Sequence, residues 1–401
     1  MDIDAAFRLL LLVRQEQTNA TGLRSGQWTA PLELARDVDV LGLAARRVLD
    51  AAEAGTPWRA ELQAYLARLA RHHGFFFIEA QRVSDALAAR SIPAVVLKGV
   101  GLARTLYVKP EDRSFRDLDL LVPPEALDEA LACAEGLGYS RLRPELDALY
   151  RRHHFHLILE GPGRPRLELH WALARPDALY TVDPALLLES PDHGPGFPVP
   201  RPEAQALHCV LNLMRSGFTE LKRLVDLDRL ARRPAGLDLE WLEAQCRRAG
   251  LDRARRLAFW MCRELLDTPL PSPPARELHP LPRLGVAGFP LGLPPAGRPL
   301  APQAVRLFLT EHKARWACEV LLRPRFERHR LAAMGKGPAH RGLAMAKRLL
   351  RALQLAPWML GLVDRSHHRR LLALTTSLRS SSGPREADRD GIPERSSSAS
   401  P

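Results

Sequence analysis

The stretch VLKGVGLARTLYVKPEDRSFRDLDLLV, residues Val96–Val122, carries the pattern that decides the fold of this chain. It ends in an apolar run that holds two aspartates at alternate positions, Asp117 and Asp119. Aspartate is a poor strand former, and burying an unpaired carboxylate costs several kcal/mol. Because alternate residues of a strand point to one face, both carboxylates are expected to face a divalent metal ion. The alternative is a surface salt bridge from Asp117 to Arg113 or Arg116.

The same stretch opens with a Lys-Gly turn at Lys98–Gly99. Glycine lets the backbone approach a ligand, and backbone N–H groups at such a turn attract an anion. An anion-binding turn upstream of a metal-binding aspartate pair suggests chemistry on a nucleoside triphosphate (NTP). A plain strand-to-helix turn is the alternative. Arg113 has two candidate roles, as a clamp on a phosphate or as a contact that holds its loop against the aspartate strand.

The pattern around this stretch predicts an α+β fold with a small mixed sheet. Apolar runs bounded by Gly and Pro predict strands, and a five-residue Gly/Pro loop between two such runs predicts a hairpin. The expected elements are a strand at Ile92–Leu97, a helix at Gly101–Tyr107, a polar loop at Lys109–Ser114, a strand at Leu118–Val122, a helix at Glu125–Leu137, and a hairpin of Phe155–Glu160 with Arg166–Trp171.

Four histidines accompany the predicted hairpin. His153, His154 and His156 lie at its start, and His170 follows Glu168 by two residues. His154 and His156 share one strand face, as do Glu168 and His170, so a His/Glu zinc site is one interpretation. The other interpretation is that these histidines orient the carboxylates or contact a nucleobase or phosphate.

This order of motifs resembles the uncharacterised nucleotidyltransferase family of bacterial proteins, across roughly Leu9–Leu265. The motifs that carry the resemblance are Leu97–Lys98–Gly99, Arg113, Asp117–Leu118–Asp119, Glu168–Leu169–His170–Trp171 and Leu224–Val225–Asp226–Leu227. One position departs from the superfamily, since Val100 stands where its turn usually has serine or glycine. Triphosphate binding would then depend on backbone amides and Lys98.

The resemblance implies a Mg²⁺-dependent (or Mn²⁺-dependent) enzyme that moves an NMP group from an NTP to a hydroxyl acceptor and releases pyrophosphate. Asp117, Asp119 and Glu168 would be the catalytic residues and the metal ligands. The residues that would bind the nucleotide are Lys98, Gly99, Arg113 and His170. The acceptor could be a protein side chain, a small molecule such as an aminoglycoside-like sugar, or an RNA end.

Two other functions stay open. The first is a catalytically weak nucleotide-binding scaffold or sensor whose basic C-terminal region contacts a partner. The second is a zinc hydrolase built on the histidines. Asp226 is equally ambiguous, because an acid on a helix beside Lys222 and Arg223 can form an ion pair or help close a cleft over the nucleotide.

Helical periodicity, proline content and the resemblance together divide the whole chain into six expected regions, among which the nucleotidyltransferase palm is what the resemblance implies. These are an N-terminal helical region (1–90), a nucleotidyltransferase palm (91–190), a helical domain that packs on the palm (203–267), a Pro-rich linker (268–302), a basic helical region (303–378) and a disordered tail (380–401). Within the helical parts, Leu32–Ala52, Ala60–Ala89, Glu203–Met214, Glu220–Ala231 and Leu239–Arg248 carry the helical pattern.

The net charge of +12 is concentrated near the C-terminus. Residues 301–380 hold 16 Arg/Lys against 4 Asp/Glu, whereas the rest of the chain holds 42 of each. This excess indicates either arginine-rich, solvated helix faces or a surface for an anionic partner, such as RNA or a phospholipid surface.

Composition also bounds the location of the protein. The chain has 401 residues and 46% hydrophobic content, enough for two or three domains with sizeable cores. Its five cysteines form no CxxC pair, which favours a reducing compartment and argues against a structural zinc module. Leu9–Val13 is too short for a signal sequence, and no stretch reaches the roughly 18–20 apolar residues of a membrane span. The expected location is therefore the cytoplasm.

Overall fold

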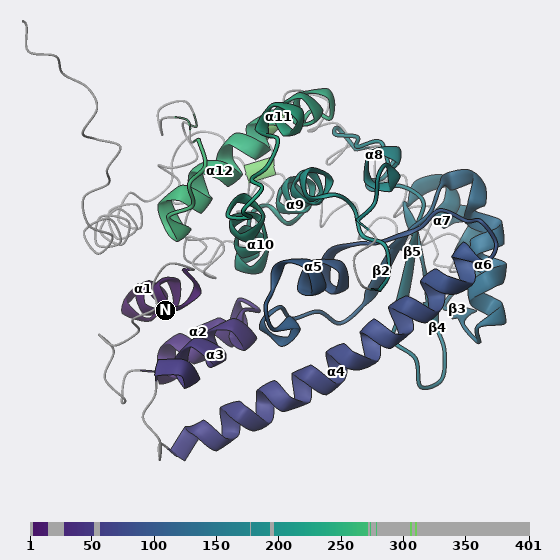
Figure 1. Ribbon diagram of the computed structural model, residues 1–401. Helices are drawn as coiled ribbons and strands as arrows, with labels where there is room; N and C mark the ends of the chain where they lie inside the picture. Colours follow the sequence, from purple (N-terminus) through teal and green to yellow (C-terminus); the bar gives the residue numbers. More distant parts are fainter. Residues whose placement is uncertain are drawn as a thin grey trace, which may run out of the picture.

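A computed structural model of the chain describes residues 3–14, 28–51, 57–176, 178–192 and 196–271, and six further positions (Figure 1). Those six are Pro273, Leu278, Val305, Arg306, Leu309 and Thr310. The described residues form an α+β fold, as predicted from the sequence. Most of the expected linker (268–302), nearly all of the basic region (303–378) and the whole tail (380–401) lie outside the described residues.

The sheet has five strands in the order β1-β2-β5-β4-β3. The strands are β1 (Val95–Val96), β2 (Leu118–Leu121), β3 (Ser140–Arg141), β4 (His156–Glu160) and β5 (Leu167–His170). The antiparallel pair of β4 and β5 confirms the predicted hairpin. The parallel pairing of β2 with β5 brings the aspartate strand next to the hairpin, with Asp119 directly opposite Glu168.

The described residues outside the sheet form α-helices and the loops that connect them. The helices are α1 (Ile3–Val13), α2 (Thr29–Asp37), α3 (Leu41–Ala51), α4 (Pro57–Ala88), α5 (Lys98–Leu106), α6 (Leu127–Gly136), α7 (Asp147–His153), α8 (Ala185–Leu188), α9 (Pro202–Ser216), α10 (Leu221–Ala231), α11 (Leu239–Arg248) and α12 (Asp252–Leu266). The predicted helices at 203–214, 220–231 and 239–248 correspond to α9, α10 and α11. The helical pattern predicted at 32–52 corresponds to two helices, because the chain turns at Asp39 with φ 64° and separates α2 from α3.

The two faces of the sheet differ because strand residues alternate between them. One face is apolar: Leu118 and Leu120 pack with Phe76 and Val83 of α4 and with residues of α6, which lies beside the end of α4 (Figure 1). The opposite face of β2 holds Asp119 and turns toward the C-terminal helices. We call this second side the polar face. It is defined by Asp117, Asp119, His156, Glu168 and His170, as the strand registers dictate.

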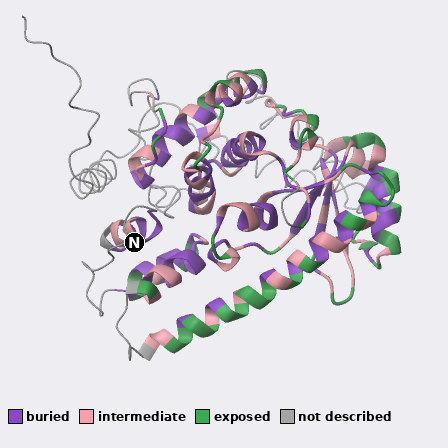
Figure 2. Cartoon of the chain, viewed as in Figure 1, coloured by how far each residue is buried: buried purple, intermediate pink, exposed green. Residues whose placement is uncertain are grey.

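A second core joins the two ends of the described chain. Leu9 and Leu10 of α1 are buried with Phe259 of α12 in the same cluster, and Arg14 Nε donates a hydrogen bond to the Leu265 carbonyl at 3.1 Å. The sides of α1 and α12 that face this core are buried, whereas the outer side of α4 is exposed (Figure 2). Four described positions after Thr268 are also buried in this core: Leu270, Leu278, Val305 and Leu309. In the part of the chain that the structure describes, no helix has the length and apolarity needed to cross a membrane.

Candidate active site

The centre of the polar face is an acidic pair fixed by strand register. Asp119 on β2 lies opposite Glu168 on β5, so their side chains leave neighbouring strands on the same side. The Asp119 side chain is almost fully buried, at 2% exposure, whereas that of Glu168 keeps 17%. Two carboxylates at such proximity repel each other, so this geometry requires a cation nearby.

Lys98 supplies one such cation. Its ammonium forms an ion pair with Asp119 Oδ1 and lies 3.9 Å from Glu168 Oε2. Lys98 begins α5 with a positive φ of 46°, a conformation that non-glycine residues adopt at a cost. The adjacent Leu97 N–H donates to the Asp119 carbonyl at 2.9 Å, which anchors this turn to β2. The Lys-Gly turn therefore lies directly beside the acidic pair.

Asp117 has a different environment from Asp119. It is half-buried and, within the described residues, forms no hydrogen bond or ion pair. Burial and the negative charges of Asp119 and Glu168 raise the pKa of Asp117 to about 6. The alternative contact, a salt bridge to Arg113 or Arg116, does not form. Together, Asp117, Asp119 and Glu168 offer a set of carboxylate oxygens that fits a divalent cation with oxygen ligands.

Asp119 stays ionised for a specific reason. Although burial opposes its charge, Lys98 and a hydrogen bond from His170 hold the pKa of Asp119 well below its usual range. His170 Nε2 lies 2.9 Å from Asp119 Oδ1. Since an ionised carboxylate can only accept, the proton of the imidazole belongs on Nε2 in this arrangement. His170 thus orients the buried aspartate.

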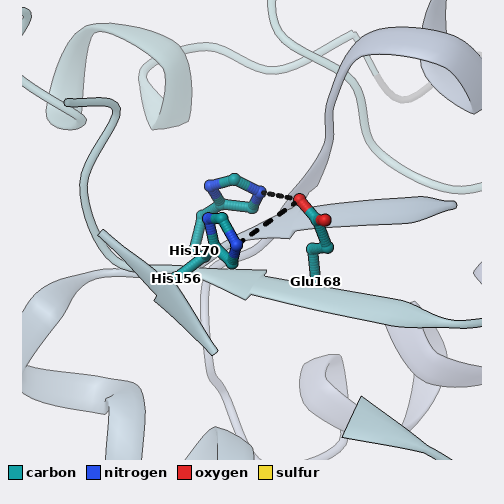
Figure 3. Close-up of side chains that lie close together, drawn as sticks. All are labelled: His156, Glu168 and His170. Atoms are coloured by element: carbon teal, nitrogen blue, oxygen red, sulfur yellow. Dashed lines mark ion pairs between the residues drawn. The ribbon is translucent and has the colours of Figure 1, made fainter. Parts of the chain in front are cut away.

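Three side chains of β4 and β5 meet at the edge of the acidic pair (Figure 3). His170 Nε2 is 3.4 Å and His156 Nε2 is 3.9 Å from the same oxygen, Glu168 Oε2. Burial and the neighbouring histidines hold the pKa of His156 well below its usual value, so its ring is neutral. His154 does not belong to this group of three side chains. Its ring stacks on Phe155, and burial lowers its pKa to about 3.

Arg113 lies away from the acidic pair. Its guanidinium forms a buried bidentate ion pair with Asp226 of α10, with Nε to Oδ1 and Nη2 to Oδ2 distances of 2.8 Å. The Tyr107 hydroxyl donates to the same Asp226 at 2.8 Å, and Arg113 also donates to the Ser114 carbonyl. Because these contacts occupy the guanidinium, the structure gives Arg113 a role in joining its loop to α10. Asp226 forms the ion pair that is one of its two expected roles.

Gly99 is required by packing as well as by any ligand. A Cβ built on Gly99 would lie 2.4 Å from Phe115 Cβ, closer than two non-bonded carbon atoms can approach. Phe115 in turn packs against His73 and Phe76 of α4. The glycine therefore brings α5 against the loop that leads into β2, and so helps to align Lys98 with Asp119.

The helices opposite the polar face contribute positive charge that the sequence motifs did not indicate. Arg215, in the last turn of α9, is half-buried with its guanidinium 4.4 Å from the Phe155 ring centroid. Burial lowers the pKa of Arg215, which also interacts electrostatically with Asp119 and Glu168. Among the described residues no carboxylate forms an ion pair with it. The sequence feature that could have indicated Arg215 is its position just before Gly217, the glycine that ends α9.

A small pocket continues from Lys98 between α5 and the helices α9 and α10. Its polar lining includes Lys98, Gln205, His208, Asn212, Arg223 and Asp226. His208 is buried, and burial together with the charge of Lys98 keeps its pKa well below the usual value. The pocket therefore offers neutral donors and acceptors beside the cationic side of the site.

A comparison with protein families gives one match. The model of a family described as an uncharacterised nucleotidyltransferase matches residues 24–267, which include every residue of the polar face and helices α9–α12. A comparison with curated proteins found no match.

Proposed function

The chain belongs to the uncharacterised nucleotidyltransferase family, and we propose that it transfers an NMP group from an NTP to a hydroxyl acceptor with the help of Mg²⁺ or Mn²⁺. The observation that carries this proposal is the group of three carboxylates on the polar face. Asp119 and Glu168 lie in direct register, and their charges help to raise the pKa of Asp117 to about 6. Such repulsion is relieved by a bound divalent cation.

The metal would be held by Asp117, Asp119 and Glu168. When bound, it would supply positive charge at the α-phosphate and lower the pKa of the attacking hydroxyl. The donor set fits this role because all three residues offer carboxylate oxygens, the ligands that Mg²⁺ prefers. Lys98 neutralises part of this charge in the metal-free protein, since it contacts both Asp119 and Glu168.

The triphosphate would bind between the polar face and α9. Lys98 and Arg215 are the cations that flank the carboxylates, and Arg215 has no carboxylate partner within the described part of the chain. A half-buried guanidinium without a counter-charge is costly, and a phosphate would supply that charge. In this proposal Arg215 and Lys98 hold the phosphates, since the side chain of Val100 offers no hydroxyl at the turn.

The transfer itself needs one proton acceptor. The acceptor oxygen bonds to the α-phosphorus while the bond from that phosphorus to the pyrophosphate oxygen breaks. The hydroxyl proton passes to Glu168, whose side chain is accessible because 17% of it is exposed. His170 acts by positioning, because its Nε2 lies 2.9 Å from Asp119 and 3.4 Å from Glu168.

A double-label experiment tests the proposal. The purified protein is incubated with Mg²⁺ and a cell lysate that supplies acceptors, with NTPs labelled either at the α- or at the γ-phosphate. We expect an acceptor that is labelled only when the protein is added, from the α-label alone, and no such labelling from the Asp117→Asn variant. Labelling from the γ-phosphate that requires the added protein and is absent from the lysate alone would indicate a kinase and contradict the proposal. NTP binding without any transfer would favour the alternative, a nucleotide-binding scaffold.

The C-terminal region enters the proposal through its charge. We propose that residues 301–380, with 16 basic and 4 acidic residues, bind an anionic partner such as RNA. An RNA acceptor would then be attracted by the same chain that modifies it.

A further inference from the structure

We propose that His156, Glu168 and His170 form a binding site for a transition-metal ion, with Zn²⁺ as the best-suited ion. This site lies on the β4 side of the polar face and uses nitrogen ligands that the carboxylate group lacks. It goes beyond the proposed transfer reaction and does not rest on it, because the argument needs only these three side chains and their surroundings.

Strand pairing fixes the three side chains in one place. His156 and His170 are direct partners across the β4–β5 ladder, and Glu168 lies two residues before His170 on the same face. One ligand atom from each residue lies within 4.8 Å of the others (Figure 3). Zinc ligands at about 2.0–2.2 Å from the ion are a little over 3 Å apart, so small side-chain rotations would close the site.

The distances to Glu168 support this geometry. Its Oε2 atom is 3.4 Å from His170 Nε2 and 3.9 Å from His156 Nε2, so both rings turn the same nitrogen toward one carboxylate oxygen. An ion bound at His170 Nε2 would replace the hydrogen bond from this nitrogen to Asp119, and the ring proton would move to Nδ1. The site is also sheltered: the side-chain exposures are 1% for His170, 12% for His156 and 17% for Glu168.

The donor set selects the class of metal. Two imidazoles and one carboxylate form a set typical of catalytic zinc, whereas Mg²⁺ prefers oxygen ligands alone. His154 is not a ligand in this proposal, although the sequence pattern includes it, because its ring stacks on Phe155 at 4.6 Å between centroids.

Glu168 connects this site to the carboxylate group. Its contacts with Lys98, His156 and His170 all use Oε2. A metal ion at the histidines would take the place of the Lys98 ammonium at this oxygen.

Zinc titration of the full chain tests the proposal. Calorimetry with Zn²⁺ in millimolar Mg²⁺, and the visible absorption of bound Co²⁺, are recorded for the wild type, His156→Gln and His170→Gln. The matched control is His72→Gln, which removes an exposed histidine of α4. We expect one tight Zn²⁺ site that Mg²⁺ does not block, and at least a tenfold loss of affinity in either ligand variant, since even indirect partners of a metal contribute that much. The control should bind as the wild type.

Folding is checked by thermal melting, because His170 is fully buried and its replacement disturbs the core; His156, at the rim, keeps the test decisive. Equal Zn²⁺ affinity in the wild type and His156→Gln, or an equal loss in His72→Gln, would overturn the proposal. Asp117→Asn should keep the Zn²⁺ site while it abolishes NMP transfer. Failure of the transfer experiment with an intact Zn²⁺ site would therefore contradict the proposed function alone.

Discussion

Asp117 and Asp119 are two residues apart, yet their carboxyl groups have opposite pKa shifts. Asp119 is buried against Lys98 and His170, which hold its pKa well below the usual range. Asp117 lacks such partners among the described residues, and burial with its two acidic neighbours raises its pKa to about 6. At the scale of single residues, Asp119 is thus part of the folded core, whereas Asp117 is a half-buried carboxylate without a partner in the described part of the chain.

Asp117→Asn should stabilise the metal-free protein above pH 6. The pKa of Asp117 is about 6 in the folded protein against an ordinary 3.8, so the folded state binds more protons between these values. Stability therefore falls as pH rises through this range, and asparagine removes that loss. We expect a gain of about 1–2 kcal/mol at pH 7.5, after allowance for solvent screening, and almost none below pH 4.

Urea unfolding in EDTA at pH 7.5 and pH 4 measures this difference. A wild type that is the more stable of the two at pH 7.5 without metal would contradict the account of Asp117. Asp119→Asn is a poor substitute in this test, because it leaves the Lys98 ammonium and His170 without their buried partner.

At the scale of elements, a glycine sets the distance between α5 and the loop before β2. Gly99→Ala would place a Cβ 2.4 Å from Phe115 Cβ, and we expect a loss of about 1–3 kcal/mol from the resulting overpacking. Gly74→Ala in α4 is the matched control, since nothing lies within 4 Å of its Cβ. Alanine there should stabilise the helix by about 0.5–1 kcal/mol. Thermal melts showing equal effects would refute the packing role of Gly99.

The buried ion pair joins the loop before β2 to α10. Asp226→Asn leaves the Arg113 guanidinium buried without a charged partner, which should cost about 3–5 kcal/mol in the free energy of unfolding. Tyr107→Phe removes one hydrogen bond to the same aspartate and should cost clearly less, about 1–2 kcal/mol. Denaturant unfolding compares the two. Similar losses would show that the ion pair is not the main contact.

Local patterns predicted most of the elements, whereas long-range contacts either followed only from the family resemblance, as for Glu168 beside the aspartate strand, or were not predicted. The strand of Asp119 and the β4–β5 hairpin follow from apolar alternation and turn residues close in sequence. The parallel pairing of β2 with β5 and the Arg113–Asp226 pair, 113 residues apart, depend on chain folding that no local pattern encodes. The short β3 and α7 were missed because two and seven residues give no clear period.

The candidate site divides in the same way. Asp117, Asp119, Glu168, Lys98 and His170 were all singled out from the sequence, and the structure brings them to one side of the sheet. Arg215 was missed because its place beside Phe155 depends on how α9 crosses the polar face. The sequence suggested two candidate roles for Arg113. Its partner in the structure is Asp226, which belongs to α10.

At the scale of the whole molecule, the two ends of the described chain share one core, so the C-terminal part is tested in the full chain. Truncation after Thr268 would remove the buried Leu270, Leu278, Val305 and Leu309. We expect Arg323, Arg325 and Arg328 replaced together by Gln to weaken RNA binding and to flatten its salt dependence, because fewer counterions are released. The control replaces Arg36, Arg68 and Arg71, which are exposed on the N-terminal helices. Mobility shifts with mixed RNA at two salt concentrations measure the effect, and equal retention of both variants would contradict an anionic-partner surface at 301–380.

The central claim is that the polar face is a metal-dependent triphosphate site, and calorimetric binding of a non-hydrolysable NTP analogue tests it most directly. The analogue is titrated into the wild type, Asp117→Asn and Arg215→Gln, each with Mg²⁺ and with EDTA. We predict tight binding only for the wild type with Mg²⁺, a loss of the Mg²⁺ dependence in Asp117→Asn, and weaker binding in Arg215→Gln at both conditions. Equal affinity of all three proteins, or wild-type binding unchanged by EDTA, would contradict the account.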